Sequence, residues 1–153
     1  AIGGMMLAHA ASAQGLTVVH AIAGEEAPLC LDAIPACVYV SPEIACVGLT
    51  QADCQQRGIE AKVGKALMGA NGRTLIANGQ RGFIKVVVDA QDGRVLGAQL
   101  MCERATDMID SFTVAIANGL TATQLMRAVR PHPTFLEAVG EALDALEGRA
   151  IHS

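Results

Sequence analysis

The side chains best suited to chemistry lie in one short segment, where His132 stands between Pro131 and Pro133 and Glu137 follows five residues after it. Each proline fixes its own φ angle, so the backbone that carries the imidazole is stiffer than usual. A carboxylate that hydrogen-bonds one imidazole nitrogen fixes the tautomer and stabilises the charged ring. An imidazole held in this way can give and take protons during a reaction. We therefore predict that His132 and Glu137 form an acid–base pair that exchanges a proton with a sulfur atom.

A structural interpretation of the same segment stays open. Thr134 and Glu137 have the spacing of a capping box, in which the carboxylate accepts a hydrogen bond from the backbone at the start of a helix. A histidine in a proline-rich turn is also more often structural than catalytic. The remaining histidines, His9, His20 and His152, show no spacing typical of metal ligands, so we predict no metal site.

The five cysteines predict neither a zinc site nor a redox dithiol, because their number is odd and no C-x-x-C pair occurs. We interpret them as small buried side chains in a protein of the reducing cytoplasm. They are Cys30, Cys37, Cys46, Cys54 and Cys102.

Length and composition indicate one compact domain that buries part of its surface against another domain or subunit. The 153 residues are 52% hydrophobic and 17% charged, and the mean hydropathy is +0.38. The net charge of −4, the absence of a Lys/Arg run and an aromatic content of 3% argue against nucleic acid and membrane surfaces as partners. Because the chain starts without an initiator Met or a basic leader, we expect it to be part of a longer polypeptide.

The elements that must position the pair are a series of strands followed by a series of helices. Helical patterns cover 5–23, the segment between Thr50 and Gly58, 106–118, the residues after Thr121, and 134–147. Strand patterns cover 37–40, 44–49, 60–68, 83–89 and 94–102, and 69–82 is a glycine-rich loop with a short turn near Leu75. This order predicts an α+β fold with a mostly antiparallel sheet and helices packed on one side.

Four stretches together resemble one known family, the class I pyridine nucleotide–disulfide oxidoreductases, and cover almost the whole chain in order. The His-Pro-Thr-x-x-Glu motif at 132–137 is similar to the carboxy-terminal signature of that family. The other three stretches are 6–11, 34–50, and 82–85 with 93–98. Within the family, the members that oxidise dihydrolipoamide are the most similar.

The resemblance implies a homodimer in which each subunit has an FAD domain, an NAD domain and an interface domain. Residues 1–24 would then be the remnant of the last FAD-domain helix, and 25–153 the dimerisation domain. The segment Met6–Ala8 (Met6, Leu7 and Ala8) would lie against the flavin of its own chain. His132 and Pro133, joined by a cis bond, would lie near the flavin of the partner subunit, where His132 and Glu137 act in trans.

Some residues depart from the family pattern. Gly3-Gly4 stands where the family has Gly-Asp, and the paired redox cysteines and the dinucleotide fingerprints are absent. We therefore expect FAD and NAD in the full-length enzyme, but no bound cofactor and no activity for this chain alone. Ala138 stands where glutathione-reductase relatives carry a second Glu, which favours lipoamide as the substrate. The resemblance then implies, as partner, the dihydrolipoyl group of a 2-oxoacid dehydrogenase or glycine cleavage complex. The alternative is a structural dimerisation module of a reductase that acts on another, glutathione-like disulfide.

Overall fold

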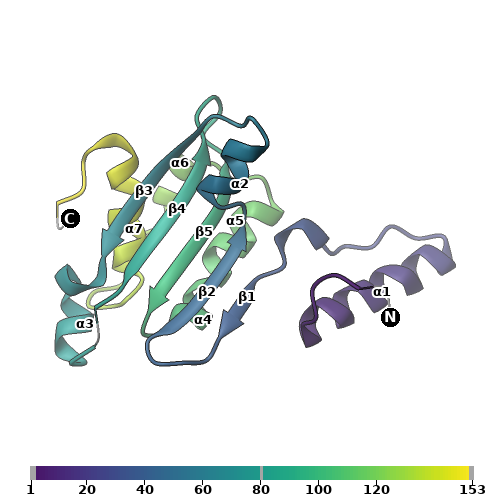
Figure 1. Ribbon diagram of the computed structural model, residues 1–153, viewed down its shortest axis with the longest axis horizontal. Coiled ribbons are helices and arrows are strands. Elements are labelled where there is room, and N and C mark those ends of the chain that lie inside the picture. Colours follow the sequence, from purple (N-terminus) through teal and green to yellow (C-terminus); the bar gives the residue numbers. More distant parts are fainter. Residues whose placement is uncertain (1–2, 80, 152–153) are drawn as a thin grey trace.

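A five-stranded antiparallel sheet forms the centre of the computed structural model, which describes residues 3–79 and 81–151 (Figure 1). The strand order is β1-β2-β5-β4-β3, and every neighbouring pair is antiparallel. The strands are β1 (Ala36–Val38), β2 (Glu43–Gly48), β3 (Ala61–Leu67), β4 (Phe83–Asp89) and β5 (Val95–Cys102). The predicted α+β class with a mostly antiparallel sheet is confirmed.

The central hairpin of β4 and β5 forms at the Asp-Gly pair that predicted it. Gly93 has a φ of +75°, a conformation that glycine adopts without steric cost. The Asp92 carboxylate accepts hydrogen bonds from the backbone N–H and the Nε–H of Arg94, at 2.9 and 2.7 Å. Beyond the turn, the buried residues Val86 and Ala98 pair directly across the two strands. The hairpin therefore sets which residues of β4 and β5 pair in the middle of the core.

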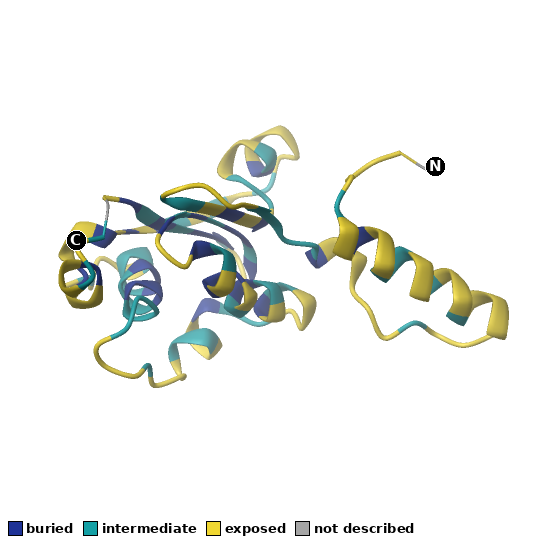
Figure 2. Cartoon of the chain, turned by 90° about the horizontal axis from the view of Figure 1, so that it is seen from below, coloured by how far each residue is buried: buried dark blue, intermediate teal, exposed yellow. Residues whose placement is uncertain are grey.

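Helices cover one face of the sheet, and the core lies between the two layers (Figures 1 and 2). In β2, the buried residues Ala45 and Val47 alternate with the exposed residues Ile44 and Cys46, as the period of two in a strand requires. The helices on this face are α4 (Ala105–Met108), α5 (Asp110–Ala117) and α7 (Glu137–Asp144). The largest buried side chains are those of Phe112, Met68, Ile84, Leu100 and Leu143.

Two short connecting helices begin at the capping boxes that the sequence predicts. They are α2 (Gln51–Gln56) and α6 (Ala122–Met126). In α2 the Thr50 hydroxyl accepts the N–H of Asp53, and the Asp53 carboxylate accepts the N–H of Thr50. Thr121 and Gln124 make the same reciprocal pair in α6. Each box satisfies two backbone donors that a helix start would otherwise leave open.

Several predicted elements differ in extent from the structure: the helix predicted at 5–23 begins at Ala8, and the strand predicted at 37–40 spans Ala36–Val38. The helix at 106–118 is divided at Ile109, whose carbonyl accepts the N–H groups of both Phe112 and Thr113. The glycine-rich loop at 69–82 contains an additional helix, α3 (Gly72–Ile76). The last helix begins at Glu137, three residues later than predicted, because the residues before it form i→i+3 turns.

The first helix, α1 (Ala8–Ala23), extends away from the sheet at one end of the molecule (Figures 1 and 2). Its only buried residue within the described chain is Ala10, whereas Val19 and Ile22 are 62% and 82% exposed. His9 Nε2 lies 2.7 Å from the carbonyl oxygen of Pro35 and ties the start of the helix to the segment before β1. An apolar sequence of this kind is typical of a helix that packs on several sides, but within this chain its main neighbour is η1 (Leu31–Ala33).

Candidate active site

The turn that carries His132 lies between α6 and α7 and is held by short hydrogen bonds. The His132–Pro133 peptide bond is cis, as is the Ser41–Pro42 bond. The Thr134 hydroxyl donates to the carbonyl oxygen of Pro131 at 2.7 Å, which closes the turn across the histidine. The backbone on both sides of His132 is therefore fixed by a covalent ring and by a hydrogen bond.

A single carboxylate joins the histidine to the start of α7. Glu137 Oε1 lies 2.9 Å from His132 Nδ1, and Glu137 Oε2 accepts the N–H of Thr134 at 2.9 Å. One oxygen of Glu137 thus makes the contact that an acid–base pair requires, and the other accepts a backbone N–H just before α7. The Thr134 hydroxyl donates to Pro131, and Thr134 is not the N-cap residue of α7, because the helix begins only at Glu137 after Leu136.

The arrangement leaves the outer edge of the imidazole available to a reactant. The side chain of His132 is 78% exposed, whereas that of Glu137 is 32% exposed. Because a carboxylate only accepts hydrogen bonds, the Nδ1 that faces it carries the proton, and Nε2 becomes the basic nitrogen of the neutral ring. An exposed base whose tautomer is fixed from behind can take a proton from an incoming group.

The sequence did not predict the residues that hold this turn from the segment after β3. Asn71, 8% exposed, precedes α3, and its Nδ2 donates to the carbonyl oxygen of Thr134 at 3.0 Å. The guanidinium of Arg73 lies 5.8 Å from the ring centre of Phe135. Asn71 and Thr134 lie 63 residues apart in the sequence, so these contacts join two distant segments. No local pattern marks such a pair, although an Asn inside a glycine-rich loop is a common cap.

Arg130 supports the same turn from the side of α6. Its guanidinium donates to the carbonyl oxygens of Leu125 and Ala128, at 3.3 and 3.2 Å. Burial lowers the pKa of Arg130, and the carboxylate of Asp144 on α7 opposes that shift. The side chain therefore ties the end of α6 to the segment that leads into His132.

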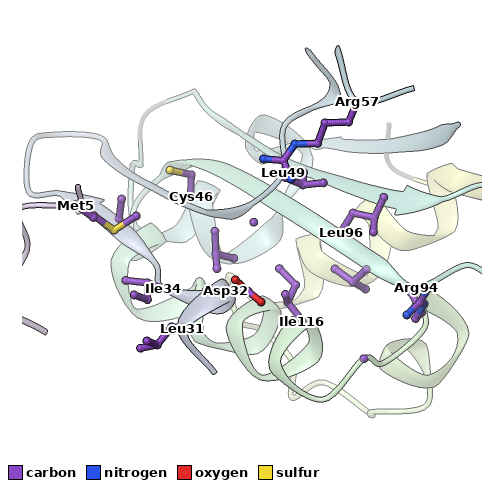
Figure 3. Close-up of a pocket in the computed structure, with 15 residues that line it drawn as sticks. Met5, Leu31, Asp32, Ile34, Cys46, Leu49, Arg57, Arg94, Leu96 and Ile116 are labelled. Carbon is purple, nitrogen blue, oxygen red and sulfur yellow. The ribbon is translucent and has the colours of Figure 1, made fainter. Parts of the chain in front are cut away.

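A cavity of about 330 Å³ opens beside the pair. Its wall includes His132, Glu137, Asn71, Leu67 and Glu141. A larger cavity of about 620 Å³ lies elsewhere, between the segment before α1 and the outer strands, and its labelled lining residues include Met5, Leu31 and Cys46 (Figure 3). The chemistry-bearing side chains thus line the smaller of these two cavities.

The predicted flavin-contacting residues at the N-terminus lie far from the His132 turn. Met6 is 96% exposed, and Leu7 is the N-cap residue of α1 without a side-chain hydrogen bond to the first turn. Figures 1 and 2 show α1 at one end of the molecule and the α6–α7 region towards the other. One chain therefore does not bring Met6, Leu7 and Ala8 together with His132 and Pro133.

The cysteines are all free, but only two of them are buried. Cys54 and Cys102 lie in the interior, Cys37 is half-buried, and Cys30 and Cys46 are exposed. The prediction that all five are buried is thus wrong for Cys30, which lies in a surface loop, and for Cys46, which points to the outer face of β2. Burial raises the pKa of the Cys102 thiol to about 12.

The described residues form neither a metal-ligand cluster nor a membrane-spanning helix. Over 3–79 and 81–151, no three side chains of His, Cys, Asp or Glu gather as metal ligands would. Within the same ranges, no helix combines the length and the apolar character that crossing a bilayer demands. His152 lies outside the described residues.

Comparisons with known proteins place the chain in a family. The family model of the pyridine nucleotide-disulphide oxidoreductase dimerisation domain matches residues 34–143. The chain is 40% identical over 148 residues to a dihydrolipoyl dehydrogenase of Haloferax volcanii, which covers 97% of this chain and 31% of that protein. It is 39% identical over 152 residues to a dihydrolipoyl dehydrogenase of Bacillus subtilis, covering 99% of this chain and 32% of that protein.

A solved structure agrees with these relatives. The crystal structure of LpdA from Mycobacterium tuberculosis matches with a TM-score of 0.86 and 27% identity, over 94% of this chain and 32% of that one. The chain thus spans about a third of the length of the relatives it matches. Because the family model covers most of its residues, the chain belongs to the dimerisation-domain family of the pyridine nucleotide–disulphide oxidoreductases.

Proposed function

We propose that this chain is the interface domain of a dihydrolipoamide dehydrogenase and that His132 is the acid–base group of that enzyme, oriented by Glu137. The observation that carries the proposal is the 2.9 Å contact between His132 Nδ1 and Glu137 Oε1 on a ring that is 78% exposed. The names of the relatives, which are about 40% identical, supply the substrate class.

The geometry supports proton transfer at Nε2 of His132. The imidazole takes the proton of one substrate thiol, and the thiolate attacks a disulfide that lies outside this chain, so that its S–S bond breaks. His132 gives this proton to the released enzyme sulfur and then takes the proton of the second substrate thiol. The second thiolate attacks the substrate sulfur of the mixed disulfide and displaces the enzyme sulfur as a thiolate, so the substrate leaves as a cyclic disulfide and its two electrons remain in the enzyme dithiol. Glu137 stabilises the imidazolium that forms in each transfer.

We propose residues 1–24 as part of an FAD domain and residues 25–153 as the dimerisation domain. The N-terminus of α1 fits a flavin, because its first-turn N–H groups have no side-chain cap and Met6 offers exposed apolar surface. In the full-length enzyme, Met6, Leu7 and Ala8 would hold the FAD of their own chain, and His132 and Pro133 would lie near that of the partner. The flavin, when bound, passes the electrons of the dithiol to NAD.

The distance between the two ends of the chain supports action in trans. Because α1 and the His132 turn lie far apart, both can face one flavin only when two chains supply them. The dimerisation-domain family supports a homodimer. The exposed apolar side chains of α1 also fit a helix covered by other domains of the same polypeptide. The free cysteines fit the reducing cytoplasm.

The test is His132→Gln in the full-length enzyme. We expect oxidation of dihydrolipoamide to fall about 10²–10⁴-fold, because that is the usual contribution of an acid–base group. Reduction of the bound flavin by NADH needs no proton from a thiol and serves as the control, which should stay near the wild-type rate. Near-normal dithiol oxidation in this variant would leave the turn with a structural role alone. Faster turnover of glutathione disulfide than of lipoamide would favour the alternative substrate.

A further inference from the structure

Asn71 is one of two buried polar side chains among the described residues, and its hydrogen bonds divide into two groups. Its Oδ1 accepts the N–H of Thr74 at 2.9 Å and the Thr74 hydroxyl at 3.1 Å, which caps α3. Its Nδ2 donates to the carbonyl oxygen of Thr134 at 3.0 Å. A buried amide is costly unless it is bonded, so the position of this side chain is well determined. The Oδ1 atom of Asn71 therefore holds its own loop, and the Nδ2 atom holds the His132 turn.

The contact with Thr134 falls at the point where the turn meets the acid–base pair. The N–H of Thr134 donates to Glu137, and its carbonyl oxygen accepts from Asn71. A shift of Thr134 therefore moves a hydrogen-bonding partner of the carboxylate that orients His132. The stacking of Arg73 on Phe135 joins the same two segments a second time.

We propose that Asn71 is a positioning residue that keeps the Glu137 carboxylate against Nδ1 of His132 by anchoring the carbonyl oxygen of Thr134. This deepens the proposed function and rests on it for any effect on turnover, but the anchoring itself is independent of the substrate. The cap of α3 holds this amide in place, and Asn71 also lines the cavity beside the pair.

Two substitutions distinguish the hydrogen bond that Asn71 donates to Thr134 from those that it accepts from Thr74. Asn71→Asp keeps the acceptor for Thr74 but sets an oxygen against the carbonyl oxygen of Thr134. Thr74→Val, the matched control, also removes one buried hydrogen bond at Asn71 and leaves the bond to Thr134 intact. In the full-length enzyme we expect Asn71→Asp to lower kcat/KM for dihydrolipoamide by about 10- to 100-fold, since displacements near 1 Å have effects of that size. We expect Thr74→Val to stay within about twofold of wild type.

A double-mutant cycle shows whether Asn71 acts through the histidine. In a His132→Gln background, Asn71→Asp should lower turnover by less than about twofold more, because the group that it positions is already gone. A loss as large as in the wild-type background would indicate general damage and overturn the proposal.

A direct measurement keeps the inference separate from the proposed function. In the 153-residue chain labelled with ¹⁵N-histidine, the His132 ring, assigned by comparison with His132→Gln, should carry its neutral-form proton on Nδ1. Asn71→Asp should give a mixture of tautomers, and Thr74→Val should not. An unchanged tautomer in Asn71→Asp would refute the positioning role. A mixed tautomer together with unimpaired dithiol turnover in both Asn71→Asp and His132→Gln would uphold the positioning role and refute the proposed function.

Discussion

Gly64→Ala should displace the helix that carries Glu137, because β3 and α7 touch through their backbones at this glycine. A Cβ atom on Gly64 would lie 2.0 Å from the carbonyl oxygen of Ala142 and 3.0 Å from Cγ of Leu146. The carbonyl belongs to the backbone of α7 and cannot rotate away, so the helix or the strand must move. An ordinary carbon–oxygen contact is about 3.3 Å, which requires a displacement of roughly 1.3 Å.

The size of the effect follows from this displacement. Overpacking of a well-packed core usually costs about 1–3 kcal/mol of unfolding free energy. Alanine gains roughly 0.5–1 kcal/mol over glycine within a strand, which leaves a net loss of up to about 2.5 kcal/mol, centred near about 1.2 kcal/mol. For a domain of this size, each kcal/mol corresponds to about 2–4 °C, and we expect the Tm to fall by about 4 °C and by at most roughly 10 °C.

Thermal unfolding of the chain, followed by circular dichroism, measures this shift. Gly140→Ala is the control on the same helix, because its Cβ would meet only Nη1 of Arg130 at 3.6 Å, an ordinary contact. Alanine gains up to about 1 kcal/mol over glycine inside a helix, so Gly140→Ala should leave the Tm unchanged or raise it. A Gly64→Ala variant as stable as wild type would show that β3 and α7 are not in backbone contact and would refute the reasoning.

Two further predictions concern single groups. Because burial raises the pKa of Cys102 to about 12, a thiol reagent at pH 8 should label the exposed Cys46 quickly and Cys102 only after unfolding; equal rates measured by peptide mass spectrometry would contradict the packing. Hydrogen bonds from the hydroxyl and the N–H of Thr50 hold the pKa of Asp53 below its usual 3.8. The ionised capping box therefore stabilises the fold fully above pH 3.8. This stabilisation is lost as the pH falls through the lowered pKa of the folded state. An NMR titration of Asp53 with a midpoint at or above 3.8 would disprove this, and Thr50→Val should move the midpoint up.

The sheet and the caps were predictable because their signals are local. Asp92-Gly93 specifies a tight turn between two strands, and the structure forms a hairpin there. The capping boxes at Thr50 and Thr121 need only residues three positions apart, and both form. The contact of His132 with Glu137 also lies within one turn of chain, and the spacing was sufficient to predict it.

The remaining features depend on contacts between segments that are distant in the sequence. Four glycines and two asparagines at 69–82 predict a loop, yet Asn71 caps α3 there because its amide is bonded on both sides in the interior. The spacing of Thr134 and Glu137 predicts a helix from Thr134, but the residues that follow form i→i+3 turns and the helix begins only at Glu137. Cys46 was placed inside on composition, although alternation with Ala45 and Val47 turns it outward.

The two contacts of the Glu137 carboxylate couple the local stability of this turn to the orientation of the imidazole. One oxygen of Glu137 accepts the N–H of Thr134, just before α7, and the other contacts Nδ1 of His132. When this turn opens, the imidazole therefore loses its fixed orientation at the same time. Heating, denaturant or a weakened β3–α7 contact should therefore free the His132 ring before the sheet itself unfolds. The tautomer of this histidine then becomes an early reporter of local opening in this domain.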